Sequence, residues 1–151
     1  MTPMSSPDFP LQPDTARLLV HLRHDGPLTR AQLAEATGLA RSTVSSRLES
    51  LLETALVVPR GGTSSGGRPA GLLEFQPRAR LLLAIDLGAT HGVVALSDLA
   101  GDVVELEAVA LDIADGPTVV LDWALAAADR LIAASGRRAS ELLGVGIGLP
   151  G

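Results

Sequence analysis

The amino-acid sequence predicts an α+β fold in two parts: three short helices closed by a β-hairpin, and then a β-β-β-α-β lobe. Apolar residues follow helical spacing from about residue 14 to residue 52, and runs of strand length dominate after residue 79. The change falls at Pro77-Arg78. We therefore expect residues 14–78 and 79–151 to form separate domains, preceded by a flexible tail of residues 1–13.

The composition restricts the classes of function. Hydrophobic residues make up 46% of the 151 residues, enough to build a core, and no cysteine is present, which excludes disulfides and thiolate zinc sites and fits a reducing cytoplasm. We find no secretion leader and no apolar run near the roughly 20 residues of a membrane span, so we predict a cytoplasmic protein that does not bind membranes. The net charge of −5 is uneven, because residues 1–78 carry +1 and residues 79–151 carry −6, as in a modular binder.

Two helices are predicted at the start of the first part. Apolar residues at helical spacing begin at Ala16, and Gly26-Pro27 ends this helix. Thr29 and Gln32 have the spacing of a capping box, so a second helix should begin at Thr29 and end at Thr37-Gly38-Leu39. The expected apolar face of the first helix comprises Ala16, Leu19, Val20, Leu22 and Arg23.

A third helix is predicted from about residue 40 to residue 52, with one apolar and one polar face. At about 100° per residue, Val44, Leu48 and Leu51 turn inward against the other helices. The polar face is expected to carry Arg41, Ser42, Thr43, Ser46 and Arg47. Small hydroxyls suit base edges or phosphate and arginines reach phosphates, so this face fits a DNA major groove, although an ordinary solvated helix face has the same pattern.

A β-hairpin is predicted next, with strands at Leu56–Val58 and Leu72–Phe75. Its tip contains Gly66-Gly67-Arg68-Pro69, which sets one arginine in a thin, extended backbone. Such a segment can enter a narrow minor groove, although a flexible loop has a similar composition. Three helices followed by this wing form a winged helix-turn-helix, and we predict that it binds double-stranded DNA. The predicted DNA contacts are Thr29, Arg30, Arg41, Ser42, Thr43, Ser46, Arg47 and Arg68.

The second part is predicted to be a partial actin-like or ribonuclease-H-like lobe. Its four strands are expected at Leu81–Ile85, Val93–Leu96, Val103–Ala110 and Leu142–Ile147. The first of these is a continuous apolar run, as expected for a buried strand. A long helix should begin at Pro117 and end near Ser135. One helix leaves a face of the sheet bare, so we interpret the chain as a fragment of a longer protein.

Three segments of the first part occur in an order known from one protein family. They are Thr29–Ala34, Thr37–Ser45 and Gly66–Pro69. Over residues 14–78 the chain resembles the head of ROK-family repressors (repressors, open reading frames and kinases). The resemblance implies a sugar-responsive transcription regulator, in the first place a repressor of carbohydrate uptake or catabolism genes, that acts on operator DNA as a homo-oligomer. Ala40 departs from the family, which usually has a serine N-cap there, so either Ser42 caps a later start or the helix frays.

Two glycine-containing segments of the second part resemble ligand-binding motifs of the same family. Asp86-Leu87-Gly88-Ala89-Thr90 is similar to its first phosphate motif, where glycine allows close approach and aspartate orients a metal or water. Gly144–Gly151 is similar to the segment that leads into the sugar site. The residues that the resemblance assigns to a sugar or sugar-phosphate effector are Asp86, Gly88, Thr90, Gly148 and Gly151. A tight turn and a tight strand exit are the alternative explanations.

The resemblance also admits other functions. Sugar kinases of the family share the second part and would bring Asp86, Gly88 and Thr90 to ATP, but they do without the DNA-binding head. A DNA-binding remnant without a sensing role is a third alternative. We expect a non-enzyme without catalytic residues, metal ligands or cofactors within this chain. The family's catalytic aspartate and its cysteine-histidine zinc motif would lie beyond Gly151.

Overall fold

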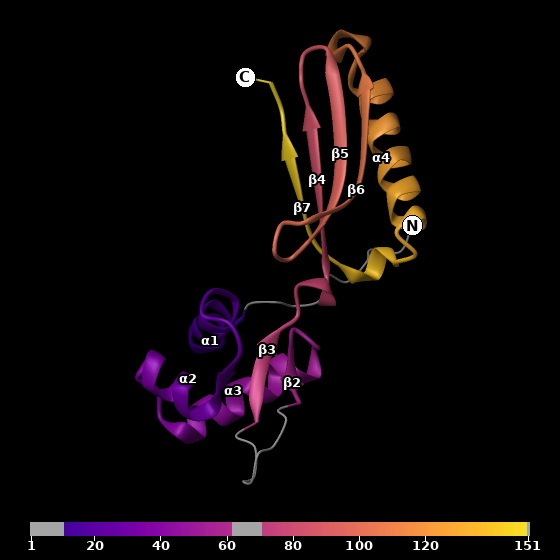
Figure 1. The fold of residues 1–151 in the computed structure, drawn as a ribbon. Coiled ribbons are helices and arrows are strands. Elements are labelled where there is room, and N and C mark those ends of the chain that lie inside the picture. The colour runs from indigo at the N-terminus through magenta and orange to yellow at the C-terminus, as the bar shows by residue number, and fades with distance from the viewer. Residues whose placement is uncertain (1–10, 62–70, 151) are drawn as a thin grey trace. The chain divides into compact units, whose positions relative to one another are not determined.

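The computed structural model describes residues 11–61 and 71–150. They divide between Gln76 and Pro77 into two compact units, each with its own sheet and helices (Figure 1). The predicted α+β fold is confirmed, with a winged helix first and a sheet-containing unit after it. Within the described part of the chain, no helix is long and apolar enough to cross a membrane.

The first unit is the predicted winged helix-turn-helix. Its helices are α1 (Pro13–His24), α2 (Arg30–Thr37) and α3 (Arg41–Glu53). Its strands are β1 (Leu28–Thr29), β2 (Val57–Arg60) and β3 (Leu72–Phe75), which form an antiparallel sheet in the order β1-β3-β2. The sequence did not predict β1, because two residues carry no periodicity and this strand exists only through its pairing with β3.

The start and the buried face of α1 differ from the prediction. The helix begins at Pro13, the last residue of the predicted tail, because proline is well suited to the first helical turn. The rest of that tail, residues 1–10, lies outside the described residues. Thr15, Leu18 and Leu22 are buried, whereas Val20 is 52% exposed, so the apolar face predicted around Val20 was wrong.

Local hydrogen bonding explains the ends of α2 and α3. The capping box predicted for α2 is confirmed, since the Thr29 side chain accepts from the Gln32 amide and the Gln32 side chain accepts from the Thr29 amide. Gly38 then ends α2 in the left-handed conformation, with φ of 70°. The N-cap of α3 is Ala40, without a side-chain cap. The alternative of a later start capped by Ser42 is therefore wrong.

The second unit is a four-stranded sheet with one long helix. Its strands are β4 (Leu81–Leu87), β5 (His91–Asp98), β6 (Val103–Ala110) and β7 (Leu142–Gly148), in the order β6-β5-β4-β7. Neighbouring strands are antiparallel except β4 and β7, which are parallel. The helix α4 (Pro117–Ala134) makes the crossover that a parallel pair requires. Single 3-10 turns occur at η1 (Pro77–Ala79), η2 (Ile113–Asp115) and η3 (Ala139–Glu141).

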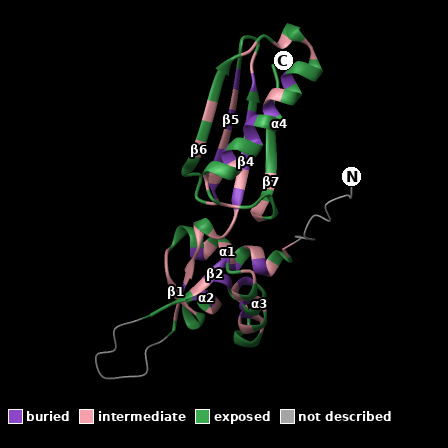
Figure 2. Cartoon of the chain, turned by 90° about the vertical axis from the view of Figure 1, so that its right-hand side faces the viewer, coloured by how far each residue is buried: buried purple, intermediate pink, exposed green. Residues whose placement is uncertain are grey.

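The core of the second unit lies between the sheet and α4 (Figure 2). Along β4, Leu83 and Ile85 are buried under the helix, whereas Ala84 and Asp86 between them are exposed. The expectation of a wholly buried first strand is therefore wrong for the described residues. The physical reason is that α4 covers only one face, so the pleat exposes every second residue to the other side.

Candidate nucleic-acid interface and ligand turn

The outer face of α3 is built as the sequence predicts. Val44 and Leu48 are fully buried against the core of the first unit, and Ser42 and Ser46 are exposed on the opposite side. A hollow of about 280 Å³ lies on this exposed face, lined by Ser42, Thr43, Ser46 and Arg47. The hydroxyl groups are thus free to meet a partner, as direct reading of base edges requires.

Arg47 carries an unsatisfied donor at the same hollow. Its Nε atom is buried and has no hydrogen-bond partner in the part of the chain that the structure describes. A buried donor without a partner typically costs about 1–3 kcal/mol, so such atoms are rare in folded proteins. The guanidinium of an arginine otherwise suits the oxygen atoms of phosphate or guanine.

The end of α2 is held by a residue of α1 that the sequence analysis did not single out. The Arg17 guanidinium of α1 donates a hydrogen bond of 2.6 Å to the carbonyl oxygen of Thr37 at the end of α2. The buried Thr37 hydroxyl donates to the Leu33 carbonyl at 2.6 Å. Arg17 therefore satisfies a carbonyl that the helix itself leaves unpaired. No sequence pattern reveals this, because the two residues lie on different helices.

The other predicted DNA contacts have different surroundings. The Thr29 hydroxyl is used within the capping box, where it also donates to Gln32 at 2.9 Å. Arg30 and Arg41 are exposed in the first turns of α2 and α3. Arg68 lies outside the described residues, as does the rest of the predicted wing tip. Beside that tip, the ladder of β2 and β3 is complete from Val57↔Phe75 to Arg60↔Leu72.

In the second unit, the ring of His91 lies against the turn between β4 and β5. The Gly88 amide donates to the His91 carbonyl at 2.9 Å, and a Cβ atom at Gly88 would fall only 2.0 Å from Cε1 of the His91 ring. His91 Nε2 also lies 3.5 Å from Asp86 Oδ2. Gly88 is therefore required for packing of His91, a reason that the sequence motif did not reveal.

The glycine-rich end of β7 lies beside the same turn. Gly148 pairs with Asp86 in the parallel ladder, and a Cβ atom there would fall 3.0 Å from Asp86 Oδ1. The structure thus brings together Asp86, Gly88, His91 and Gly148, while Thr90 is exposed at the turn and Gly151 lies outside the described residues. Among the residues described, no group of three or more histidine, cysteine or acidic side chains is arranged to hold a metal ion.

Comparison with known proteins agrees with this architecture. Residues 9–68 match the MarR family. The xylose repressor of Bacillus subtilis is 33% identical over 135 residues, which are 89% of this chain and 35% of that protein. A putative xylose repressor of Caldicellulosiruptor is 28% identical over 82% of this chain and 31% of its own length. The chain spans about a third of the length of these relatives.

A solved structure shows the same fold across both units. It is described as a ROK family transcriptional regulator, a homologue of the Escherichia coli MLC protein. The TM-score is 0.65 at 22% identity, and the match covers 89% of this chain and 34% of that one. The related proteins with assigned roles are named as repressors or regulators. The chain is thus similar in sequence to xylose repressors and in fold to a ROK family transcriptional regulator, and its first unit contains the segment that matches the MarR family.

Proposed function

We propose that this chain is the DNA-binding part of a sugar-responsive repressor, together with a portion of its sensing domain. The observation that carries the proposal is the outer face of α3, where exposed Ser42 and Ser46 flank a hollow that Arg47 also lines. This face fits the major groove of an operator, because its hydroxyl groups can adapt to base edges and its arginine can reach phosphate or guanine.

The names of the relatives support a sugar as effector. Several of them are xylose repressors, so D-xylose is the first compound to test. The ligand would bind where Asp86, Gly88, Thr90 and Gly148 lie, with Gly151 following them in the sequence. Two copies of the protein would place two heads on paired half-sites, because one small winged helix makes few base contacts. Such a regulator would act in the cytoplasm.

The kinase alternative receives less support from the second unit. The His91 ring lies against Gly88, and the Gly88 amide already donates to the His91 carbonyl. A nucleotide phosphate that approached this glycine would have to displace the imidazole. A non-enzymatic sensor therefore fits the turn better than a phosphate-transfer site. ADP release from ATP in the presence of D-xylose would contradict this assignment.

DNA binding can be tested with a duplex selected from a random-sequence library. Fluorescence anisotropy should show a Kd that rises steeply with salt, because phosphate contacts release counterions. Ser46→Ala should change the sequence preference more than the affinity for DNA in general. Arg47→Ala should weaken binding by about 1–3 kcal/mol. An equal loss on every sequence for Ser46→Ala would place that hydroxyl on the DNA backbone instead.

Two control variants are available in the same unit. Ser50 is on α3, but its hydroxyl donates to the Arg47 carbonyl at 2.9 Å and it does not line the hollow. Arg23 is exposed near the end of α1 and carries the same charge as Arg47. Ser50→Ala and Arg23→Ala should therefore leave the selected sequence and the Kd nearly unchanged. A failure of the protein to prefer any duplex would remove the proposal.

A further inference from the structure

The junction between the two units is held on both sides by backbone hydrogen bonds. The Gln76 amide donates to the Leu56 carbonyl at 2.9 Å, within the first unit. The Pro77 carbonyl accepts from the Leu99 amide at 3.1 Å, within the second unit. Proline fixes its own φ and restricts the residue before it. A movement of the Leu56 carbonyl or of the Leu99 amide therefore acts on two residues, Gln76 and Pro77, that are neighbours in the chain.

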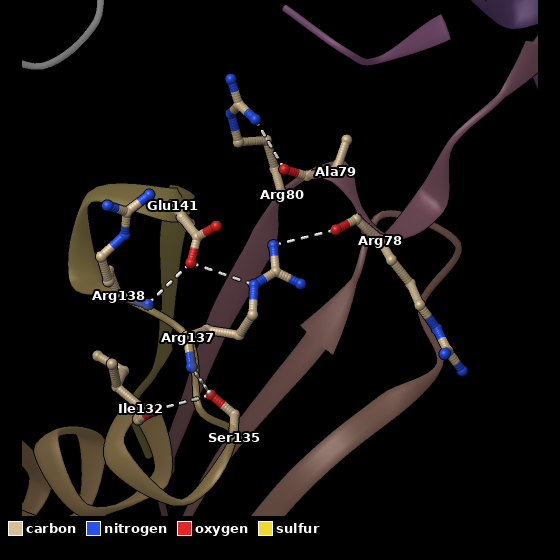
Figure 3. A network of polar contacts seen from close by, with 8 residues as sticks. All are labelled: Arg78, Ala79, Arg80, Ile132, Ser135, Arg137, Arg138 and Glu141. Carbon is tan, nitrogen blue, oxygen red and sulfur yellow. Dashed lines mark hydrogen bonds and ion pairs between the residues drawn. The ribbon is translucent and has the colours of Figure 1, made fainter. Parts of the chain in front are cut away.

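Arg137, just after the C-terminal end of α4, contacts the backbone beside this junction (Figure 3). Its Nη2 donates to the Arg78 carbonyl at 3.0 Å, and its Nε donates to Glu141 Oε2 at 3.1 Å. The Arg137 amide donates to Ser135 Oγ at 3.3 Å, and the Ser135 hydroxyl in turn donates to the Ile132 carbonyl within α4. The Arg138 amide and the Arg137 guanidinium hold the pKa of Glu141 below its usual value, so Glu141 stays ionised and keeps Arg137 in place.

The segment that leads into α4 is hydrogen-bonded to the turn between β4 and β5. The Ile113 amide donates to the Ala89 carbonyl at 3.0 Å, and η2, which contains Ile113, leads directly into the helix. Two turns further along, Trp123 packs against Gly92 so closely that a Cβ atom on that glycine would fall 2.4 Å from Cζ3 of the indole. The turn is therefore in contact with η2, which precedes α4, and Gly92 just after it is in contact with the first half of α4.

The helix is also the element of this unit that is best able to shift. β4 likewise joins the junction to the turn, but it is hydrogen-bonded to a neighbour on each side. α4 rests on the sheet through side chains, and Ala124, Ala127 and Ala128 make up much of its buried face. Small side chains interlock weakly, and sliding of packed helices by 1–2 Å is a common form of conformational switching. The 18 residues of α4 span about 27 Å.

We propose that Arg137 is a positioning residue through which α4 couples the Asp86–His91 turn to the junction at Pro77. This inference rests on the proposed function, since it explains how a ligand at the turn alters DNA binding by the other unit. Coupling between two sites is reciprocal, so DNA bound to the first unit must also change the surroundings of the turn. That second direction can be measured without knowing the ligand.

Trp123 is the only tryptophan of the chain and lies at the turn end of α4, so its emission reports on that end. The experiment titrates the protein with a labelled duplex from the library selection and follows DNA anisotropy and tryptophan emission together. In the wild type, we expect the emission to change in step with DNA binding. In Arg137→Ala, DNA should bind with an unchanged Kd, but the emission change should be lost.

Two further variants make the result decisive. Arg138→Ala removes the same charge from the neighbouring exposed residue and should keep the emission change. Arg137→Lys keeps the charge without the two-pronged contact and should lose most of the change; it replaces Arg137→Ala if circular dichroism shows that the alanine variant is unfolded. An emission change that persists without Arg137, or is absent from wild type bound to DNA, overturns the inference alone. Flat anisotropy in every variant overturns the proposed function and the inference with it.

Discussion

The guanidinium of Arg17 donates to the carbonyl oxygen of Thr37 across 2.6 Å, so α1 holds the turn that precedes α3. Arg17→Ala should lower the free energy of unfolding by about 1 kcal/mol, the usual net value of one hydrogen bond. It should also weaken DNA binding, because α3 is then less firmly oriented. Urea unfolding and anisotropy measure the two effects. Arg23→Ala on the same helix is the control, and equal behaviour of the two variants would refute the role of Arg17.

Because His91 packs on Gly88, we expect the effects of substitutions at these two positions on stability not to be additive. Gly88→Ala alone should destabilise the protein by about 0.5–1 kcal/mol, since the new methyl group would displace the half-exposed imidazole from the turn. The φ of Gly88 is not in the left-handed region, so the collision is the only strain expected. In a His91→Ala background the same change should cost little. A double-mutant cycle by thermal unfolding measures this coupling, and additive effects would contradict it.

The contact between Gly92 and Trp123 gives a second test of packing. Gly92→Ala should force the indole outward, lower the free energy of unfolding by about 1–3 kcal/mol and shift tryptophan emission to longer wavelength. Gly146→Ala is the matched control, because a Cβ atom there meets nothing within 4 Å. If both glycine variants unfold at the same urea concentration, the tight contact does not exist.

Ala55 is the only described non-glycine residue with positive φ, at 57°, and it joins α3 to β2. An L-residue in this conformation is strained by about 1 kcal/mol, which glycine avoids. Ala55→Gly should therefore raise the urea midpoint of unfolding, whereas Ala31→Gly, on the exposed surface of α2, should lower it. A lower midpoint for Ala55→Gly would show that the residue is not left-handed.

The ion pair of Glu107 and Arg130 predicts a pH dependence. The hydrogen bond from Arg130 holds the pKa of Glu107 below its ordinary value of 4.5. A carboxyl group with a lowered pKa stabilises the fold fully above that ordinary value, and the stabilisation is lost as pH falls through the folded-state pKa. Glu107→Gln should therefore unfold more easily than wild type at pH 7, and this difference should shrink as the pH is lowered further and further below 4.5. A difference between Glu107→Gln and wild type that does not depend on pH would contradict this.

Local signals in the sequence predicted part of this structure well. The Thr29 and Gln32 pair gave the start of α2, and Pro117 gave the start of α4, because caps and helix-starting prolines act within a few residues. The inward positions of α3 were also predicted, since Val44 and Leu48 repeat at helical spacing. Short-range rules of this kind need no knowledge of the rest of the fold.

Features that depend on side-chain conformation and on packing were missed. The buried carboxylate of Asp98 accepts from the amides of Ala100 and Asp102, so it serves the turn after β5 and not a ligand, which composition alone does not indicate. The link from Arg17 to Thr37 and the isolated Nε of Arg47 likewise depend on how helices pack. The sequence motif marked the turn between β4 and β5, but it did not indicate that the His91 ring lies against Gly88, which depends on a side-chain conformation.

The strand that leads into the junction is the middle one of its sheet. β3 is bonded on one edge to β2 and on the other to β1, which ends at Thr29, the N-cap of α2. A displacement of the chain at Gln76 therefore acts both on β2 and, through β1, on α2. We therefore expect the hairpin and the helix-turn-helix to respond together, as one rigid body, to a displacement of the chain at that residue.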